Sequence, residues 1–224
     1  MLSESRHTGP FETSLQEYGD VGIGLSQLSF SYGTTPVFDK LSVTAATRLL
    51  VLRGPSGCGK TSLLKLCAGI LRPSSGSVRP RRKNPIFISQ EDALFPWLTG
   101  LQNIQNVTGV SREQIEASPL YTRIQGFLDQ RAHQISFGQR RLIEIARALL
   151  VKPDMLCLDE PFNFIDPPSR ALIQELLLEP PLHLRDVTIL VSSHYDSDFA
   201  VPGITTISFD GALPVNNLVV SVKA

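Results

Sequence analysis

The sequence predicts an α/β fold on a largely parallel sheet, with an N-terminal antiparallel β subdomain and an inserted α-helical subdomain. Apolar runs at residues 49–52, 155–158 and 187–191 have the length of buried strands and alternate with helical patterns, which favours a parallel sheet. The stretches LSQLSFSY and VFDKLSVTA alternate apolar and polar residues, as strands with one buried face do. Residues 91–134 change to a mostly helical pattern with several breakers, which indicates an inserted helical lobe.

The domain boundaries follow from the same patterns. Residues 1–22 are mostly polar and lack the apolar core of a signal peptide, so we expect a flexible leader. Residues 23–224 are expected to form one domain. Its helical subdomain begins with residues 91–134 and continues through the next helix to about residue 152.

The composition limits the classes of function. Hydrophobic residues make up 42% of the chain, and 21 Lys and Arg balance 21 Asp and Glu. A formal net charge of zero argues against a nucleic-acid binder that works by bulk charge, so no nucleic-acid partner is expected. No run approaches the roughly 18 apolar residues of a spanning helix, so we expect a soluble chain whose membrane role depends on a partner. The three cysteines, Cys58, Cys67 and Cys157, are expected to be reduced thiols.

In the first half of the domain, the expected order is strand, glycine loop, helix. The strand Leu49–Leu52 runs straight into GPSGCGKT, and apolar residues then recur at helical spacing. The residues expected on one face of that helix are Leu63, Leu64, Cys67 and Ile70. A further strand, Pro85–Ser89, ends at Gln90.

In the second half, a helix, a strand, a helix and a strand are expected in turn. Ser136 is the expected N-cap of the first helix. The elements that follow are the strand Met155–Leu158, the helix Arg170–Leu178 and the strand Val187–Val191. The tail predicts a hairpin around Asp210-Gly211.

The glycine loop carries the most specific chemical pattern. Residues 54–61 match G-x-x-x-x-G-K-[ST] without a gap. Glycines allow backbone N–H groups to wrap closely around phosphate oxygens, and the following helix points its positive end at the anion. Lys60 supplies a charge to the outer phosphates, and Thr61 offers a hydroxyl to Mg²⁺. The predicted cofactor-binding residues here are Gly54, Pro55, Ser56, Gly57, Cys58, Gly59, Lys60, Thr61 and Ser62.

The glycine loop taken alone leaves two alternative interpretations open. A chance glycine-rich turn is one, although this motif follows an apolar strand and opens an amphipathic helix, as its mechanism requires. A nucleoside or metabolite kinase is another, because such enzymes use the same type of loop.

Two adjacent carboxylates end the strand MLCL. The carboxyl edge of a parallel sheet is where α/β folds bind ligands, so Asp159 can hold Mg²⁺ and Glu160 can polarise an attacking water. A helix N-cap followed by a solvated glutamate is the alternative for this pair. His194 follows the strand TILVSS, where it could donate to the γ-phosphate, although a lone histidine is more often structural.

The order of the motifs resembles the ATP-binding cassette (ABC) family over roughly residues 24–212. The loop resembles its Walker A motif, and Met155–Glu160 its Walker B motif. Further resemblances are Gln90 to the Q-loop glutamine, ISFGQ at 135–139 to the LSGGQ signature, Asn163–Asp166 to the D-loop, His194 to the switch histidine and Tyr32 to the aromatic residue that stacks on adenine. The signature is the most discriminating motif, because P-loop proteins in general have no equivalent.

The resemblance implies a P-loop NTPase core that binds ATP and Mg²⁺. It implies Glu160, His194 and Gln90 as catalytic residues, and Thr61, Gln90 and Asp159 as metal ligands. It further implies a dimer of two cassettes, with this chain paired head to tail with a second copy or a homologue. The signature residues that would cover the nucleotide across that dimer are Ser136, Phe137, Gly138 and Gln139, and Asp166 of the D-loop is a further implied cofactor-binding residue.

One residue and two short segments depart from the family pattern. Phe137 replaces the first glycine of the signature, and Ala46-Thr47 stands where a Gly-Glu turn is usual. Asn163–Asp166 differs from the common Ser-Ala-Leu-Asp, although its final Asp is kept.

The segment EDALFPWLTGLQNI resembles importers of the nitrate, sulfonate and taurine group. Phe95, Trp97 and Leu98, near Gln90, would lie where transmembrane permease subunits dock, or would simply pack the helical lobe. The leading hypothesis is therefore the ATPase subunit of an importer, at the cytoplasmic face of the membrane, with permease subunits and a solute-binding protein as partners. A non-transport ABC ATPase and a small-molecule kinase are the alternatives.

Overall fold

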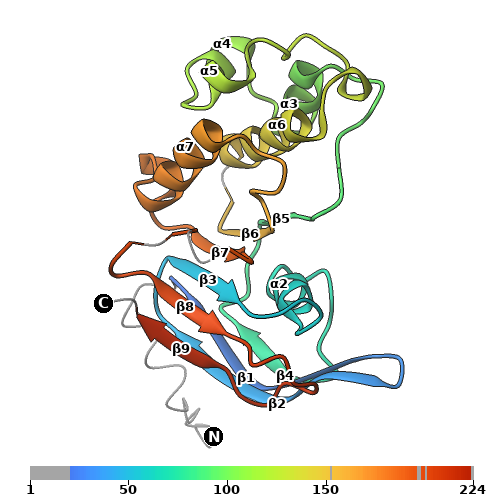
Figure 1. The fold of residues 1–224 in the computed structure, drawn as a ribbon, viewed down its shortest axis with the longest axis vertical. Coiled ribbons are helices and arrows are strands. Elements are labelled where there is room, and N and C mark those ends of the chain that lie inside the picture. The colour runs from blue at the N-terminus through green and yellow to red at the C-terminus, as the bar shows by residue number, and fades with distance from the viewer. Residues whose placement is uncertain (1–20, 152, 196–197, 200, 223–224) are drawn as a thin grey trace, which may run out of the picture.

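The structure is a computed structural model that describes residues 21–151, 153–195, 198–199 and 201–222. Two sheets and helix α2 form the lower part of the view in Figure 1, and the other α-helices form the upper part. Residues 1–20 of the predicted leader lie outside the described residues.

An antiparallel sheet opens the domain, in the order β2-β1-β4. Its strands are β1 (Ile23–Tyr32), β2 (Thr35–Ala45) and β4 (Ser75–Arg79). The register shifts between Leu25 and Leu28 on β1, where Gln27 takes a φ of 47° and the strand bulges. The sheet matches the antiparallel pattern that the alternating stretches predict.

A six-stranded sheet forms the centre of the molecule, in the order β5-β6-β7-β3-β8-β9. Its strands are β3 (Leu49–Arg53), β5 (Pro85–Ile88), β6 (Met155–Asp159), β7 (Thr188–Ser192), β8 (Thr205–Ser208) and β9 (Val219–Val222). Every neighbouring pair is parallel except β8 and β9. The five parallel strands therefore end at one edge, where parallel sheets place their ligand sites.

This sheet separates two hydrophobic cores, which explains its continuous apolar strands. Leu50 and Leu52 of β3 pack in one core, with α2 (Lys60–Cys67) and the antiparallel sheet. Val51 between them packs in the other core, with helices α6 and α7. A parallel strand covered on both faces cannot alternate polar and apolar residues.

The helices of the upper part begin at well-defined caps. Thr99, Ser111 and Ser136 each accept a hydrogen bond from the backbone three residues on, where a glutamine returns the bond. The described helical elements there are α3 (Gly100–Thr108), α4 (Arg112–Glu116), α5 (Tyr121–Ile124), η1 (Ala132–Gln134), α6 (Phe137–Leu150), α7 (Pro167–Leu178) and η2 (Leu182–Leu184). The first five lie within the segment that is expected to be helical.

Helix α2 is shorter than predicted, and the prediction for Ile70 is wrong. The helix ends at Cys67, because Ala68 is its C-cap and Gly69 takes a left-handed φ of 71°. Ile70 therefore lies beyond the helix, with 55% of its surface exposed.

The C-terminal hairpin exists around Asp210-Gly211, but its connection is longer than a two-residue turn. β8 and β9 pair antiparallel, with Ser208 opposite Val219, so the ten residues 209–218 connect them. Within that connection, the N–H of Val215 donates to the carbonyl of Val37 at 2.8 Å. The chain thus makes a detour to bond with β2 before it returns as β9.

Among the described residues, none of the helices combines the length and the apolar character needed to cross a bilayer.

Candidate nucleotide-binding and catalytic site

The loop between β3 and α2 wraps around the N-terminus of the helix. Gly54, Gly57 and Gly59 have φ angles of 148°, 77° and 105°, which glycine adopts at little cost. A Cβ atom on Gly54 would lie 2.8 Å from the Cβ of Phe209, so a side chain there would clash. The loop therefore has the shape that a cradle of backbone N–H groups around a phosphate requires.

Lys60 crosses the mouth of this loop. Its ammonium donates to the carbonyls of Gly54 and Pro55, both at 2.8 Å, and only 5% of the residue is exposed. A buried ammonium needs such oxygen partners. Phosphate oxygens are stronger acceptors than carbonyls, so Lys60 is well placed to contact a phosphate held in the loop.

Thr61 and Asp159 meet beside the loop. The hydroxyl of Thr61 donates to Oδ2 of Asp159 at 2.7 Å, and the hydroxyl of Ser192 donates to Oδ1 at the same distance. Hydroxyl and carboxylate oxygens are the ligands that Mg²⁺ prefers, and phosphate oxygens complete such sites. This donor set therefore fits a magnesium nucleotide.

Glu160, the next residue, turns its carboxylate to three neighbours. Gln90 Nε2 donates to Oε2 at 3.2 Å, Asn163 Nδ2 donates to the same oxygen at 2.8 Å, and His194 Nε2 contacts Oε1. The backbone of Glu160 takes a φ of 49°, a conformation that costs a non-glycine residue about 1–3 kcal/mol and recurs at functional sites. Its N–H donates to Ser192 Oγ at 2.8 Å, which helps to hold that conformation.

The predicted catalytic residues are thus gathered at one point, but two of their partners are missing from the prediction. Ser192 joins Asp159 to Glu160, and Asn163 holds the Glu160 carboxylate. The sequence has no specific signal for Ser192, because only the order of strands β6 and β7 brings it opposite Asp159 in the register. For Asn163 the only signal is its place within the segment that resembles the D-loop.

Tyr32 and Asp166 lie at the margins of this cluster. Tyr32 is half exposed, and its hydroxyl accepts a hydrogen bond of 3.4 Å from Ser62 at the start of α2. Its position close to the loop is compatible with stacking on a base. Asp166 accepts a hydrogen bond of 3.0 Å from the Ser169 N–H and caps α7, so its carboxylate already has a structural role.

The signature segment lies apart from the phosphate loop of the same chain. Ser136 caps α6, accepting from Gln139 N–H at 3.2 Å while Gln139 Oε1 accepts from Ser136 N–H at 2.8 Å. In Figure 1, α6 belongs to the upper part and α2 to the lower part. One chain therefore does not bring Ser136, Phe137, Gly138 and Gln139 against its own loop.

Residues 39–163 match the family model described as ABC transporter. The chain belongs to the ABC transporter family. The Taurine import ATP-binding protein TauB of Pseudomonas entomophila (strain L48) is 38% identical over 173 residues, covering 69% of this chain and 66% of that protein. The TauB of Yersinia pestis bv. Antiqua (strain Antiqua) is 36% identical over 172 residues, covering 70% and 67%. This ABC chain thus spans about two thirds of the length of these relatives.

Solved structures agree on the fold. An ABC transporter ATP-binding protein from Pyrococcus furiosus superposes with a TM-score of 0.67 at 22% identity, covering 78% of this chain and 92% of that one. An inward-facing metal-chelate type ABC transporter superposes with a TM-score of 0.70 at 22% identity, covering 90% and 83%. The predicted family and fold class are confirmed. ABC domains bind ATP with Mg²⁺, so the predicted cofactors are confirmed at the level of the family.

Two exposed aromatic residues follow Gln90 in this ABC chain. Phe95 and Trp97 are 43% and 66% exposed, their ring centroids are 5.8 Å apart, and Leu98 is half buried. Phe95 lines a cavity of about 270 Å³ together with Phe87 and Val107. The aromatic residues of the segment thus face outward instead of filling the helical lobe.

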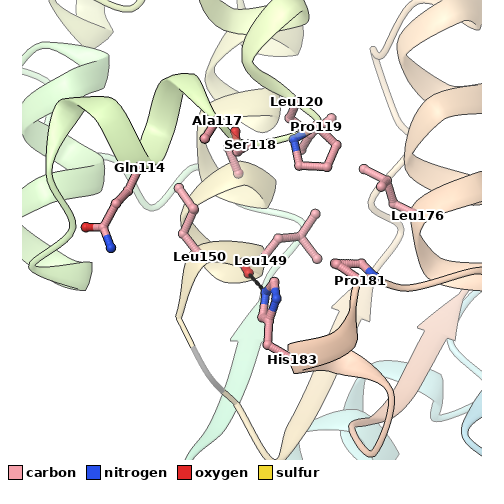
Figure 2. Close-up of a pocket in the computed structure, with 11 residues that line it drawn as sticks. Gln114, Ala117, Ser118, Pro119, Leu120, Leu149, Leu150, Leu176, Pro181 and His183 are labelled. Carbon is pink, nitrogen blue, oxygen red and sulfur yellow. Dashed lines mark hydrogen bonds between the residues drawn. The ribbon is translucent and has the colours of Figure 1, made fainter.

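A second cavity, of about 340 Å³, lies in the ABC chain between α4, α6 and the segment after α7 (Figure 2). The residues that line it are Gln114, Ala117, Ser118, Pro119, Leu120, Ala146, Leu149, Leu150, Leu176, Pro181 and His183. It contains no predicted site residue, so it is not part of the nucleotide site.

Proposed function

We propose that this chain is the ATP-hydrolysing subunit of a membrane importer. In the reaction, a water oxygen bonds to the γ-phosphorus, the bond to the ADP oxygen breaks, and ADP and phosphate leave. The observation that carries the proposal is the convergence of Gln90, Asn163 and His194 on the carboxylate of Glu160, next to the Thr61–Asp159 pair.

Glu160 is the proposed base in this reaction. Its carboxylate takes the proton from the attacking water, and the contacts from Gln90 and Asn163 hold it in one orientation. His194, whose Nε2 contacts the other carboxylate oxygen, would donate to the γ-phosphate once nucleotide is bound. Bound Mg²⁺ would neutralise charge on the phosphates, held through Thr61 and Asp159, with Gln90 as a further ligand.

Two copies of the chain, or one copy and a homologue, are proposed to enclose the nucleotide. The separation of the signature from the loop within one chain supports this arrangement, because a second cassette can supply Ser136 and the Gly138 N–H from the N-terminus of α6. Tyr32 of the first chain would stack on the base, and Asp166 would lie at the junction of the two chains.

Permease subunits are the proposed partners at the membrane. The exposed rings of Phe95 and Trp97, with Leu98 beside them, offer an apolar docking surface next to Gln90, which would link docking to Glu160. We place the chain at the cytoplasmic face of the membrane, with a solute-binding protein in the same system.

The chemistry is tested with Glu160→Gln and Lys60→Ala in ATPase assays with Mg²⁺. Loss of the base should slow phosphate release about 100-fold or more while ATP still binds and a dimer accumulates on size exclusion. Loss of the Lys60 ammonium should weaken ATP binding about ten-fold or more. Undiminished turnover of Glu160→Gln would remove Glu160 from its role, and phosphate transfer to a metabolite instead of water would favour a kinase.

The names of the relatives suggest taurine, or a similar sulfonate, as the transported solute. Cells that lack this chain should lose uptake of radiolabelled taurine and regain it with the wild-type chain but not with Glu160→Gln. Normal taurine uptake in the deletion strain would reject this solute while leaving the ATPase proposal intact.

A further inference from the structure

Phe137 occupies the position at which the resembled signature has a glycine, and its ring is held on several sides. The ring of Phe164 meets it edge-on, with centroids 5.0 Å apart and planes at 71°. The guanidinium carbons of Arg140 and Arg141 each lie 5.6 Å from its centroid. Such aromatic and cation–π contacts favour a fixed ring position.

Arg141 connects Phe137 to the segment that carries Gln90. Its side chain is 1% exposed, and its guanidinium donates to the carbonyls of Ser89 and Gln90, both at 2.6 Å. It also forms an ion pair of 2.7 Å with the buried Glu144. A buried guanidinium with this many acceptors has little freedom to move, so α6 and the Gln90 segment are joined rigidly.

Phe164 connects Phe137 to the loop that follows Glu160. It is 77% exposed and takes a left-handed φ of 65°, which is uncommon for an aromatic residue. Its carbonyl lies so close to α6 that a Cβ on Gly138 would approach it to 2.2 Å. The preceding residue, Asn163, donates to Oε2 of Glu160 at 2.8 Å.

These contacts form a closed path. It runs from Glu160 through Gln90 and Arg141 to Phe137, and returns through Phe164 and Asn163 to the same Oε2 oxygen of Glu160. We propose that Phe137 is a positioning residue for Glu160: its ring ties the N-terminus of α6 to both segments that hold that carboxylate. The proposal rests on the proposed function, because its kinetic readout is ATP hydrolysis.

The first experiment is a double-mutant cycle on ATP hydrolysis with Phe137→Leu and Phe164→Leu. Each change removes the contact between the two rings. The interaction energy of such an aromatic pair, if lost from the transition state, corresponds to a rate that is about 2- to 12-fold lower. We expect kcat to fall by this factor in each single variant, KM for ATP to stay within about two-fold, and the double variant to be no slower than the slower single one. Phe137→Tyr, which keeps a ring, should restore kcat.

Leu182→Ala is the matched control, because Leu182 is 78% exposed, like Phe164, and lies outside the path. Its kcat should equal that of the wild type. Single effects that simply multiply in the double variant, or an equal loss in the control, would overturn the proposal.

The second experiment does not need ATP hydrolysis. The N–H groups of Asn163 and Ile165 donate to the carbonyls of Glu160 and Phe162, both at 3.3 Å, so their hydrogen exchange reports on this loop. Phe164→Leu should increase the rate of that exchange several-fold while the protein stays folded. An unchanged exchange rate would contradict the proposal that the contact between the Phe137 and Phe164 rings holds this loop. If the wild type lacked ATPase activity, the proposed function would be rejected. The hydrogen-exchange measurement would still test whether the rings of Phe137 and Phe164 hold the loop after Glu160.

Discussion

At Gly138, the N-terminus of α6 packs closely against the loop after Glu160. A Cβ atom there would lie 2.2 Å from the carbonyl oxygen of Phe164, and a backbone atom cannot rotate away as a side chain can. Gly138→Ala should therefore displace the loop, destabilise the fold by about 1–3 kcal/mol and lower ATP turnover. Denaturant unfolding and phosphate release measure the two effects.

Gly126→Ala provides the matched control for this change. Gly126 lies in the same helical part, and a Cβ on it would meet nothing within 4 Å. Its stability should stay within about 0.5 kcal/mol of the wild type. Equal stability of the two variants would mean that the close approach at Gly138 is readily relieved.

Sequence patterns predict the charged residues of the site better than the residues that hold them. The phosphate loop, Asp159 and Glu160 follow from motif chemistry, and the structure gathers Gln90 and His194 around Glu160. Ser192 was not predicted, because a serine at a strand end has many possible roles and its partner lies on a strand far away in sequence. Spatial neighbours of this kind depend on strand order, which the sequence does not specify.

At the scale of secondary structure, Asp166 determines where α7 begins. Burial opposes ionisation of its carboxyl, but the hydrogen bonds from Ser169 outweigh it and hold the pKa of Asp166 below its usual value. A depressed pKa means that the folded state favours the carboxylate. The stabilisation is therefore present above about pH 4 and is lost as the pH falls through the folded-state pKa.

Asp166→Ala should cost about 1 kcal/mol at pH 7, as loss of an N-cap generally does. The difference between wild type and Asp166→Ala should shrink as the pH drops below 4, whereas Asp166→Asn, which keeps a capping oxygen, should remain close to the wild type at pH 7. Urea unfolding at a series of pH values measures both. A pH-independent difference would show that the charge of Asp166 plays no part in the cap.

The sequence predicts helices and strands with strong local signals well, but it predicts the residues at which they end less well. Ser136 caps α6 as its sequence indicates, and buried strands appear where apolar runs predict them. Ile70 fails because Gly69 ends α2 in a left-handed conformation, a signal that competes with helical periodicity. The tail makes a local turn at Asp210-Gly211, where the Ala212 N–H donates to Oδ1 of Asp210 at 3.0 Å, but the chain then bonds to β2 through Val215 before it returns as β9.

At the scale of the whole molecule, charge is distributed unevenly although the net charge is zero. The segment 40–90, which contains the phosphate loop, has no Asp or Glu. Its basic residues are Lys40, Arg48, Arg53, Lys60, Lys65, Arg72, Arg79, Arg81, Arg82 and Lys83. These cations are not all gathered at the loop, because Arg48 donates to the carbonyls of Leu177 and Leu178 and Arg82 donates to Thr188 at the start of β7.

Nucleotide binding should stabilise the whole fold, because a ligand that binds only the folded state shifts the folding equilibrium toward it. A ligand that binds only the folded state at 100 times its Kd adds about 2.7 kcal/mol, which for a chain of 224 residues corresponds to a rise in Tm of roughly 5–10 °C. With Glu160→Gln, which prevents turnover during the scan, Mg-ATP should give this rise. Because Lys60→Ala weakens ATP binding about ten-fold or more, this additional change should remove about half of the shift or more, without lowering the Tm of the free protein by a comparable amount. A full shift in the double variant would mean that ATP stabilises the fold from a site other than the loop between β3 and α2.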